Sequence, residues 1–159
     1  MQASTILDDI YNQLVTVLEN VADPINTSSK LFQNADNSWN IFDGPQTDYK
    51  GTPAAILIPL PGPESVFETN YQNKRGYGYG VLIVMDTEIT NYMSSRKNMR
   101  LIVDGVLDAL DRSNMLNGVV DILKASSLKW TEEESSLGVS IVAPLEINAV
   151  KLVQASLAL

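Results

Sequence analysis

The chain contains 159 residues, 45% of them hydrophobic and 19% charged, and its formal net charge is -8. This length suits a single domain with one core, and a surface of this charge as a whole repels nucleic-acid phosphates. The sequence has no cysteine and no histidine, which excludes disulfides, thiolate or imidazole catalysis and the usual zinc sites.

Residues 5–21 have the pattern of an amphipathic helix, because apolar side chains recur there at helical spacing. Thr5 with Asp8 three residues later resembles a capping box with Asp in place of Glu. Asp23-Pro24 predicts the end of the helix, since proline disfavours helical geometry in the residue before it. The same stretch lacks the basic region of a secretory signal, and no apolar run is long enough to cross a membrane, so we expect synthesis in the cytoplasm.

Residues 26–51 are polar and rich in Asn, Asp and Ser, which predicts a long loop with one or two short strands. Trp39 is one of the few large apolar side chains in this loop, and it is typical of an anchor in a core or an interface. Long loops in compact domains usually carry a function or contact a partner, so this loop is a contact candidate.

Two apolar runs predict an antiparallel hairpin with an extended tip. The first, TPAAILIPL, covers residues 52–60 and is bounded by prolines, and the second, KRGYGYGVLIVMD, covers residues 74–86. Between them we expect a polar connection from Glu64 to Asn73, in which Phe67 is one of the dispersed apolar side chains.

The glycines of KRGYGYGVLIVMD indicate a strand and not a phosphate-binding loop. A G-x-G-x-x-G pattern that starts at Gly76 needs glycine at position 81, where this chain has Val81. The motif also precedes an apolar run, whereas a phosphate loop follows a strand and opens a helix. As a strand, it places Tyr77 and Tyr79 on one face and leaves room for close packing on the glycine face.

The second half of the chain predicts one more helix and two more strands. The helix begins near residues 87–91 and keeps its apolar spacing to Arg112. Residues 121–131 and 139–152 then have strand patterns, with Glu132 to Glu134 as a charged turn between them. The order helix, strand, strand, helix, strand, strand predicts an α+β fold, with two helices on one face of a mostly antiparallel sheet of about four strands. Residues 1–159 form a single domain on this interpretation.

Two groups of charged residues allow more than one interpretation. Asp104, Asp108 and Asp111 share a stripe of the second helix, which can bind a divalent cation but is more commonly a solvated helix face. The dense basic residues, which are Lys74 with Arg75 and Arg96 with Lys97 and Arg100, can face phosphate or an acidic patch on a neighbouring copy of the chain. The negative net charge favours the neighbouring copy.

The order of elements extends over nearly the whole chain. It comprises the helix ILDDIYNQLVTVLENV, a long loop, GTPAAILIPLPGP, RGYGYGVLIVMD, the helix around RLIVDGVLDALDRS, and the strands ILKASSLKWTEEE and GVSIVAPLEINAVKL. This order resembles that of the tail terminator (tail completion) proteins of long-tailed bacteriophages. The resemblance implies a non-enzymatic virion protein without cofactor or metal, made in the host cytoplasm and located in the neck region of the tail.

The resemblance further implies a hexameric ring of identical copies on the head-proximal end of the tail tube. Such a ring stops polymerisation of the tail tube protein and joins the tube to the head connector or stopper protein, while DNA passes through the lumen without sequence-specific binding. The expected assembly-interface residues are Lys74, Arg75, Tyr77, Tyr79, Phe67 and Trp39. Two alternatives remain: another neck, head-completion or baseplate protein of the same fold, and a small metal-binding enzyme that uses Asp104 and Asp108.

Overall fold

The computed structural model describes residues 5–44, 51–60, 64–67, 72–113, 115–135 and 138–154. In this part of the chain the fold is α+β, with two α-helices and a mixed, mostly antiparallel sheet. The elements in chain order are α1 (Ile6–Glu19), β1 (Ile41–Asp43), β2 (Ala54–Pro59), β3 (Glu64–Phe67), β4 (Gln72–Thr87), α2 (Tyr92–Arg112), β5 (Ile122–Ser127), β6 (Thr131–Ser135) and β7 (Gly138–Gln154).

Helix α1 begins with the predicted capping box. The Thr5 hydroxyl accepts a hydrogen bond from the Asp8 amide at 3.1 Å, and the Asp8 carboxylate accepts one from the Thr5 amide at 3.4 Å. These two bonds satisfy amides that otherwise have no partner at a helix N-terminus. The helix ends at Glu19, somewhat before the predicted stop at Asp23-Pro24.

Strands β4 and β7 are the two long central strands of the sheet. They pair in antiparallel register over their full common length, from Gln72 opposite Gln154 to Thr87 opposite Val139. Strands of this length are well beyond the usual 3–10 residues, and at about 3.3 Å per residue the ladder is roughly 50 Å long. The predicted pairing of residues 52–60 with the glycine-rich strand is confirmed as the antiparallel pair β2–β4.

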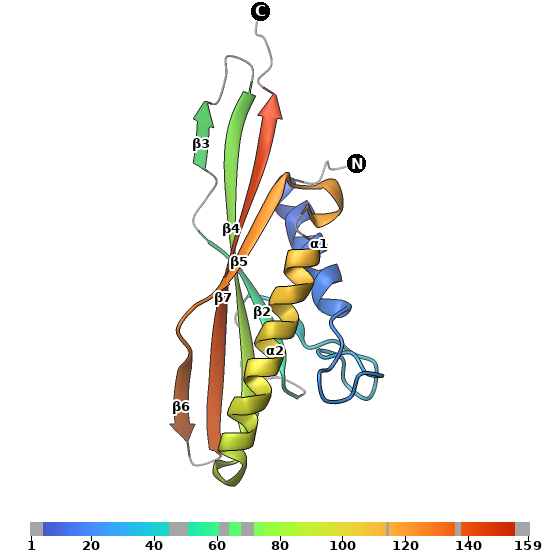
Figure 1. The fold of residues 1–159 in the computed structure, drawn as a ribbon, viewed down its shortest axis with the longest axis vertical. Helices are drawn as coiled ribbons and strands as arrows, with labels where there is room; N and C mark the ends of the chain where they lie inside the picture. Colours follow the sequence, from blue (N-terminus) through green and yellow to red (C-terminus); the bar gives the residue numbers. More distant parts are fainter. Residues whose placement is uncertain are drawn as a thin grey trace, which may run out of the picture.

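Shorter strands extend this central ladder on both sides. The sheet order is β1-β2-β4-β7-β5, with β3 paired to β4 and β6 paired to β7, and only β1–β2 is parallel among the described pairs. Both helices cover the same face of the sheet, as predicted (Figure 1). The short strand expected in the long loop is confirmed as β1.

The core lies between that face of the sheet and the two helices. Alternate residues of β4 and β7 point into it, since successive strand residues face opposite sides. Its largest fully buried side chains are Phe32, Ile10, Leu14, Leu18, Leu57, Ile83, Met99, Leu110, Leu116, Ile141, Leu145 and Ile147. Neither described helix is both long and apolar enough to cross a membrane.

Two sequence predictions about the strands are wrong. Glu132, Glu133 and Glu134 do not form a turn but belong to β6, an edge strand paired with the start of β7. The expected polar connection from Glu64 to Asn73 contains β3, so the described sheet has seven strands instead of about four. In both cases a long neighbouring strand supplies hydrogen-bond partners for the backbone. This pairing outweighs the weak strand preference of the local residues.

Candidate assembly interface

One end of the β4–β7 ladder extends past the helices as an arm, which we define as β3 with residues 72–76 of β4 and 150–154 of β7 (Figure 1). On one side, β2 pairs with β4 only as far as Tyr79, and on the other, β5 pairs with β7 only as far as Val150. Three strands therefore continue the ladder beyond the body of the domain. A projecting sheet with open edges is a typical place for contact with another chain.

The arm has two basic residues directly opposite each other. Arg75 of β4 pairs with Lys151 of β7 in the antiparallel register. The Lys151 Nζ donates a hydrogen bond to the Val119 carbonyl at 2.9 Å. Arg75 is partly exposed and forms no ion pair with an acidic side chain of the described residues. Like charges directly opposite each other destabilise a sheet, so this pair gains stability when an acidic partner approaches.

The opposite end of the ladder is acidic. Strand β6 carries Glu132, Glu133 and Glu134, all of them exposed, and we call residues 131–135 the acidic edge. Two side chains of α2 hold Glu132 in place. The Glu132 Oε1 lies 3.2 Å from the Arg96 Nε, and the Glu132 Oε2 accepts a hydrogen bond from the Tyr92 hydroxyl. That hydrogen bond is the main reason why the pKa of Tyr92 is raised, with burial second.

Tyr77 and Tyr79 lie in the core of the domain. Each is 5% exposed, and the Tyr79 hydroxyl donates a hydrogen bond to the Leu7 carbonyl of α1 at 2.9 Å. These side chains therefore attach the glycine-rich strand to the helical layer and offer almost no surface to a partner. On the other strand face, a Cβ added at Gly78 would lie 3.1 Å from the Leu60 Cβ, so the predicted close packing is confirmed there.

Because of the Tyr79 hydroxyl, the free energy of unfolding should vary with pH in the alkaline range. Burial, followed by the nearby Asp43 carboxylate, raises the pKa of Tyr79 above its ordinary value of 10.0. The unfolded chain therefore loses this proton before the folded chain does, and stability that is full below about pH 10 is lost as pH rises through the folded pKa. We expect the free energy of unfolding to fall less steeply above pH 10 in Tyr79→Phe than in the wild type.

Urea titrations at a series of pH values measure this difference. Below pH 9 the variant should be less stable by about 1 kcal/mol, the usual net contribution of one hydrogen bond. Parallel curves for the two proteins across the alkaline range would contradict the assignment.

The remaining interface candidates from the sequence are Trp39, Phe67 and Lys74, and they lie in two different parts of the fold. Trp39 is partly buried in the long loop, where its backbone bridges Gln33. The same loop is held by the buried Asn40, whose amide donates to the Asn34 side-chain oxygen at 2.7 Å. Phe67 and Lys74 lie in the arm by their backbone pairing, and their side chains are outside the part that the structure describes. Of the six candidates, Arg75, Lys74 and Phe67 therefore share one region, whereas Trp39 lies in the long loop, outside the strands of the sheet.

Lys151 and the acidic edge were not among the residues singled out as interface candidates from the sequence. Lys151 does follow the strand alternation of residues 139–152, so its side of the sheet was predictable, but its pairing with Arg75 depends on the register of β4 with β7. The three glutamates have low strand preference, and only their pairing with β7 shows that they form an edge.

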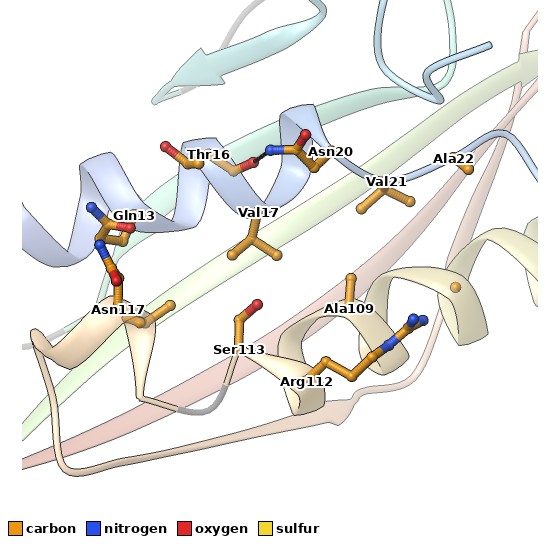
Figure 2. A pocket seen from close by; sticks show the side chains of 12 residues that line it. Gln13, Thr16, Val17, Asn20, Val21, Ala22, Ala109, Arg112, Ser113 and Asn117 are labelled. Carbon is orange, nitrogen blue, oxygen red and sulfur yellow. Dashed lines mark hydrogen bonds between the residues drawn. The ribbon is translucent and has the colours of Figure 1, made fainter. Parts of the chain in front are cut away.

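A groove of about 590 Å³ lies between the C-terminal halves of α1 and α2 (Figure 2). Its polar lining includes Gln13, Thr16, Asn20, Arg112 and Asn117. Gln13 and Asn117 point toward one another in Figure 2, and Asn20 donates a hydrogen bond to the Thr16 carbonyl at 2.8 Å. This lining offers amide, hydroxyl and guanidinium donors over an apolar floor, a chemistry suited to holding a polar group.

The acidic residues of α2 lie on its exposed side. Asp104, Asp108 and Asp111 all face outward, opposite the buried stripe of the helix. Within the described residues, no group of three or more acidic side chains is close enough together to hold a metal ion.

Comparison with protein-family models and with curated proteins finds no match. The geometry of the arm, the acidic edge and the order of elements therefore carry the functional argument.

Proposed function

We propose that this chain is a non-enzymatic virion assembly protein of the tail terminator kind. Copies of it form a closed ring, which we expect to be a hexamer, on the end of a tail tube. The ring ends polymerisation of the tube protein and joins the tube to the head connector or stopper protein, and DNA passes through its lumen. The α+β order of elements, which resembles that of tail terminator proteins, supports this proposal.

The observation that carries the proposal is the opposite charge at the two ends of one long ladder. Arg75 and Lys151 are at the arm, and the acidic edge is roughly 50 Å away at the start of β7. A contact between two different surfaces of identical copies is heterologous, and such contacts close into a ring when the rotation permits. The arm of one copy and the acidic edge of the next are complementary surfaces for that contact.

The charge of the whole chain agrees with a channel for DNA. With a formal net charge of -8, the protein as a whole repels phosphate and so does not hold back DNA that slides past it. A nucleic-acid-binding protein that must hold its ligand usually has the opposite balance.

Two measurements test the proposal together. Negative-stain images of the purified protein should show closed rings, and particles assembled without this protein should have tails of irregular and excessive length. Supplying the wild-type chain should restore uniform tails, and so should Lys30→Glu, which changes an exposed charge outside both the arm and the acidic edge. A strict monomer both in solution and in particles, or tails of normal length without the protein, would overturn the proposal.

A further inference from the structure

The outward face of α2 carries a charge pattern that is split into two halves. Its exposed residues recur at helical spacing and form one stripe, which we call the outer stripe. The outer stripe consists of Met93, Lys97, Arg100, Leu101, Asp104, Asp108 and Asp111. Its N-terminal half is therefore basic and its C-terminal half is acidic.

This order of charges is unfavourable within the helix itself. A helix is stabilised by acidic residues near its N-terminus and basic residues near its C-terminus, but the first turn of α2 has no acidic residue and its last turn has Asp111 beside one basic residue, Arg112. Arg100 and Asp104 are four residues apart but in the less favourable order, with the cation first. Among the described residues, no ion pair involves a side chain of the outer stripe. The helix alone thus does not explain the arrangement.

The outer stripe also exposes large apolar side chains. Met93 is 75% exposed, and Leu101, near the middle of the helix, is 45% exposed. An exposed apolar residue between a basic and an acidic segment has the composition of a small contact surface, with an apolar centre and a charged rim.

We propose that the outer stripe binds the outer stripe of a second copy of this chain, with the two helices antiparallel. If the helices cross near residue 102, Lys97 lies beside Asp108 of the second copy and Arg100 lies beside its Asp104. The two-fold symmetry of such an isologous contact repeats each pair, so both charged halves gain opposite partners. Antiparallel packing also places the positive end of each helix dipole beside the negative end of the other.

This contact goes beyond the proposed ring. It uses α2, whereas the ring contact uses the ends of the β4–β7 ladder, and an isologous contact joins two copies and then stops. A single helix pair is small beside the about 1,200–2,000 Å² of a standard interface, so the dimer should be weak and sensitive to salt. The inference therefore assigns to the protein a weak dimer contact that is separate from the ring contact.

A charge swap tests the inference by sedimentation of the full chain at low ionic strength. The wild type should dimerise, and Arg100→Glu or Asp104→Arg alone should each weaken dimerisation by roughly tenfold or more through like-charge contact. The double variant Arg100→Glu/Asp104→Arg should recover the wild-type dissociation constant. Lys30→Glu is the matched control for Arg100→Glu and should have no effect. No dimer in the wild type, unchanged dimerisation in the single variants, or no recovery in the double variant would overturn the inference.

Cysteine cross-linking gives an independent test, because the sequence has no cysteine of its own. Leu101→Cys lies close to the crossing point, so oxidation should give a covalent dimer. Met93→Cys should not cross-link, because nine residues from the crossing point the two positions lie about 27 Å apart in an antiparallel pair. Efficient cross-linking through position 93 and none through 101 would contradict the antiparallel arrangement. Absence of the dimer in the wild type, with intact rings and normal tails, would overturn this inference and leave the proposed function in place.

Discussion

Replacement of Gly138 by alanine should destabilise the fold more than any surface substitution. Gly138 opens β7 with a φ of +138°, a backbone conformation that residues with a side chain rarely adopt. A Cβ at this position would overlap the Thr87 carbonyl oxygen and lie 3.2 Å from the carbonyl carbon of the same residue. Backbone strain and overpacking each cost about 1–3 kcal/mol, so we expect a loss of about 3 kcal/mol in the free energy of unfolding. Urea denaturation followed by circular dichroism measures it.

Gly105 provides the matched control for this prediction. It lies inside α2, and an added Cβ would meet no atom within 4 Å. Because glycine weakens a helix relative to alanine, Gly105→Ala should raise the free energy of unfolding by roughly 0.5–1 kcal/mol. If the two variants had equal stability, the conformation assigned to Gly138 would be wrong.

The features of the fold that depend on neighbouring residues could be predicted from the sequence. The capping box at Thr5 and Asp8 is such a local pattern. The mismatch of Gly76 and Gly78 with the G-x-G-x-x-G spacing is another local pattern. It correctly predicted that these residues lie in a strand. Local patterns suffice there because helix caps and strand alternation are set by residues a few positions apart.

The features that depend on distant pairing could not be predicted. The strand identity of β6 comes from its ladder with the start of β7, and its three glutamates give no local sign of it. Tyr77 and Tyr79 were interface candidates because alternation assigns them a common face but does not say which face the helices cover. The bond from Tyr79 to Leu7 joins residues far apart in the chain, and it places that face in the core.

Reversal of the charge at Arg75 should separate assembly from stability. In the isolated chain, Arg75 lies directly opposite Lys151, so Arg75→Glu converts a like-charge pair into an opposite-charge pair. Such a change stabilises a sheet by about 0.2–1 kcal/mol, and the free energy of unfolding should rise slightly. The same variant would bring a carboxylate toward the acidic edge of the next copy, and ring assembly should weaken at least about tenfold. Urea denaturation and native mass spectrometry measure the two effects on one preparation.

The opposite signs of these two effects distinguish a contact role from a structural one. A residue that only supports the fold would lose stability and assembly together, whereas an interface residue loses assembly while the chain remains folded. Lys30→Glu makes the same change in net charge at an exposed position in the long loop, and it should leave both quantities unchanged. Rescue by Glu133→Lys would identify the acidic edge as the partner, because Glu133 is exposed and the new lysine would face the new glutamate across the contact. Full assembly of Arg75→Glu would remove the arm from the ring contact.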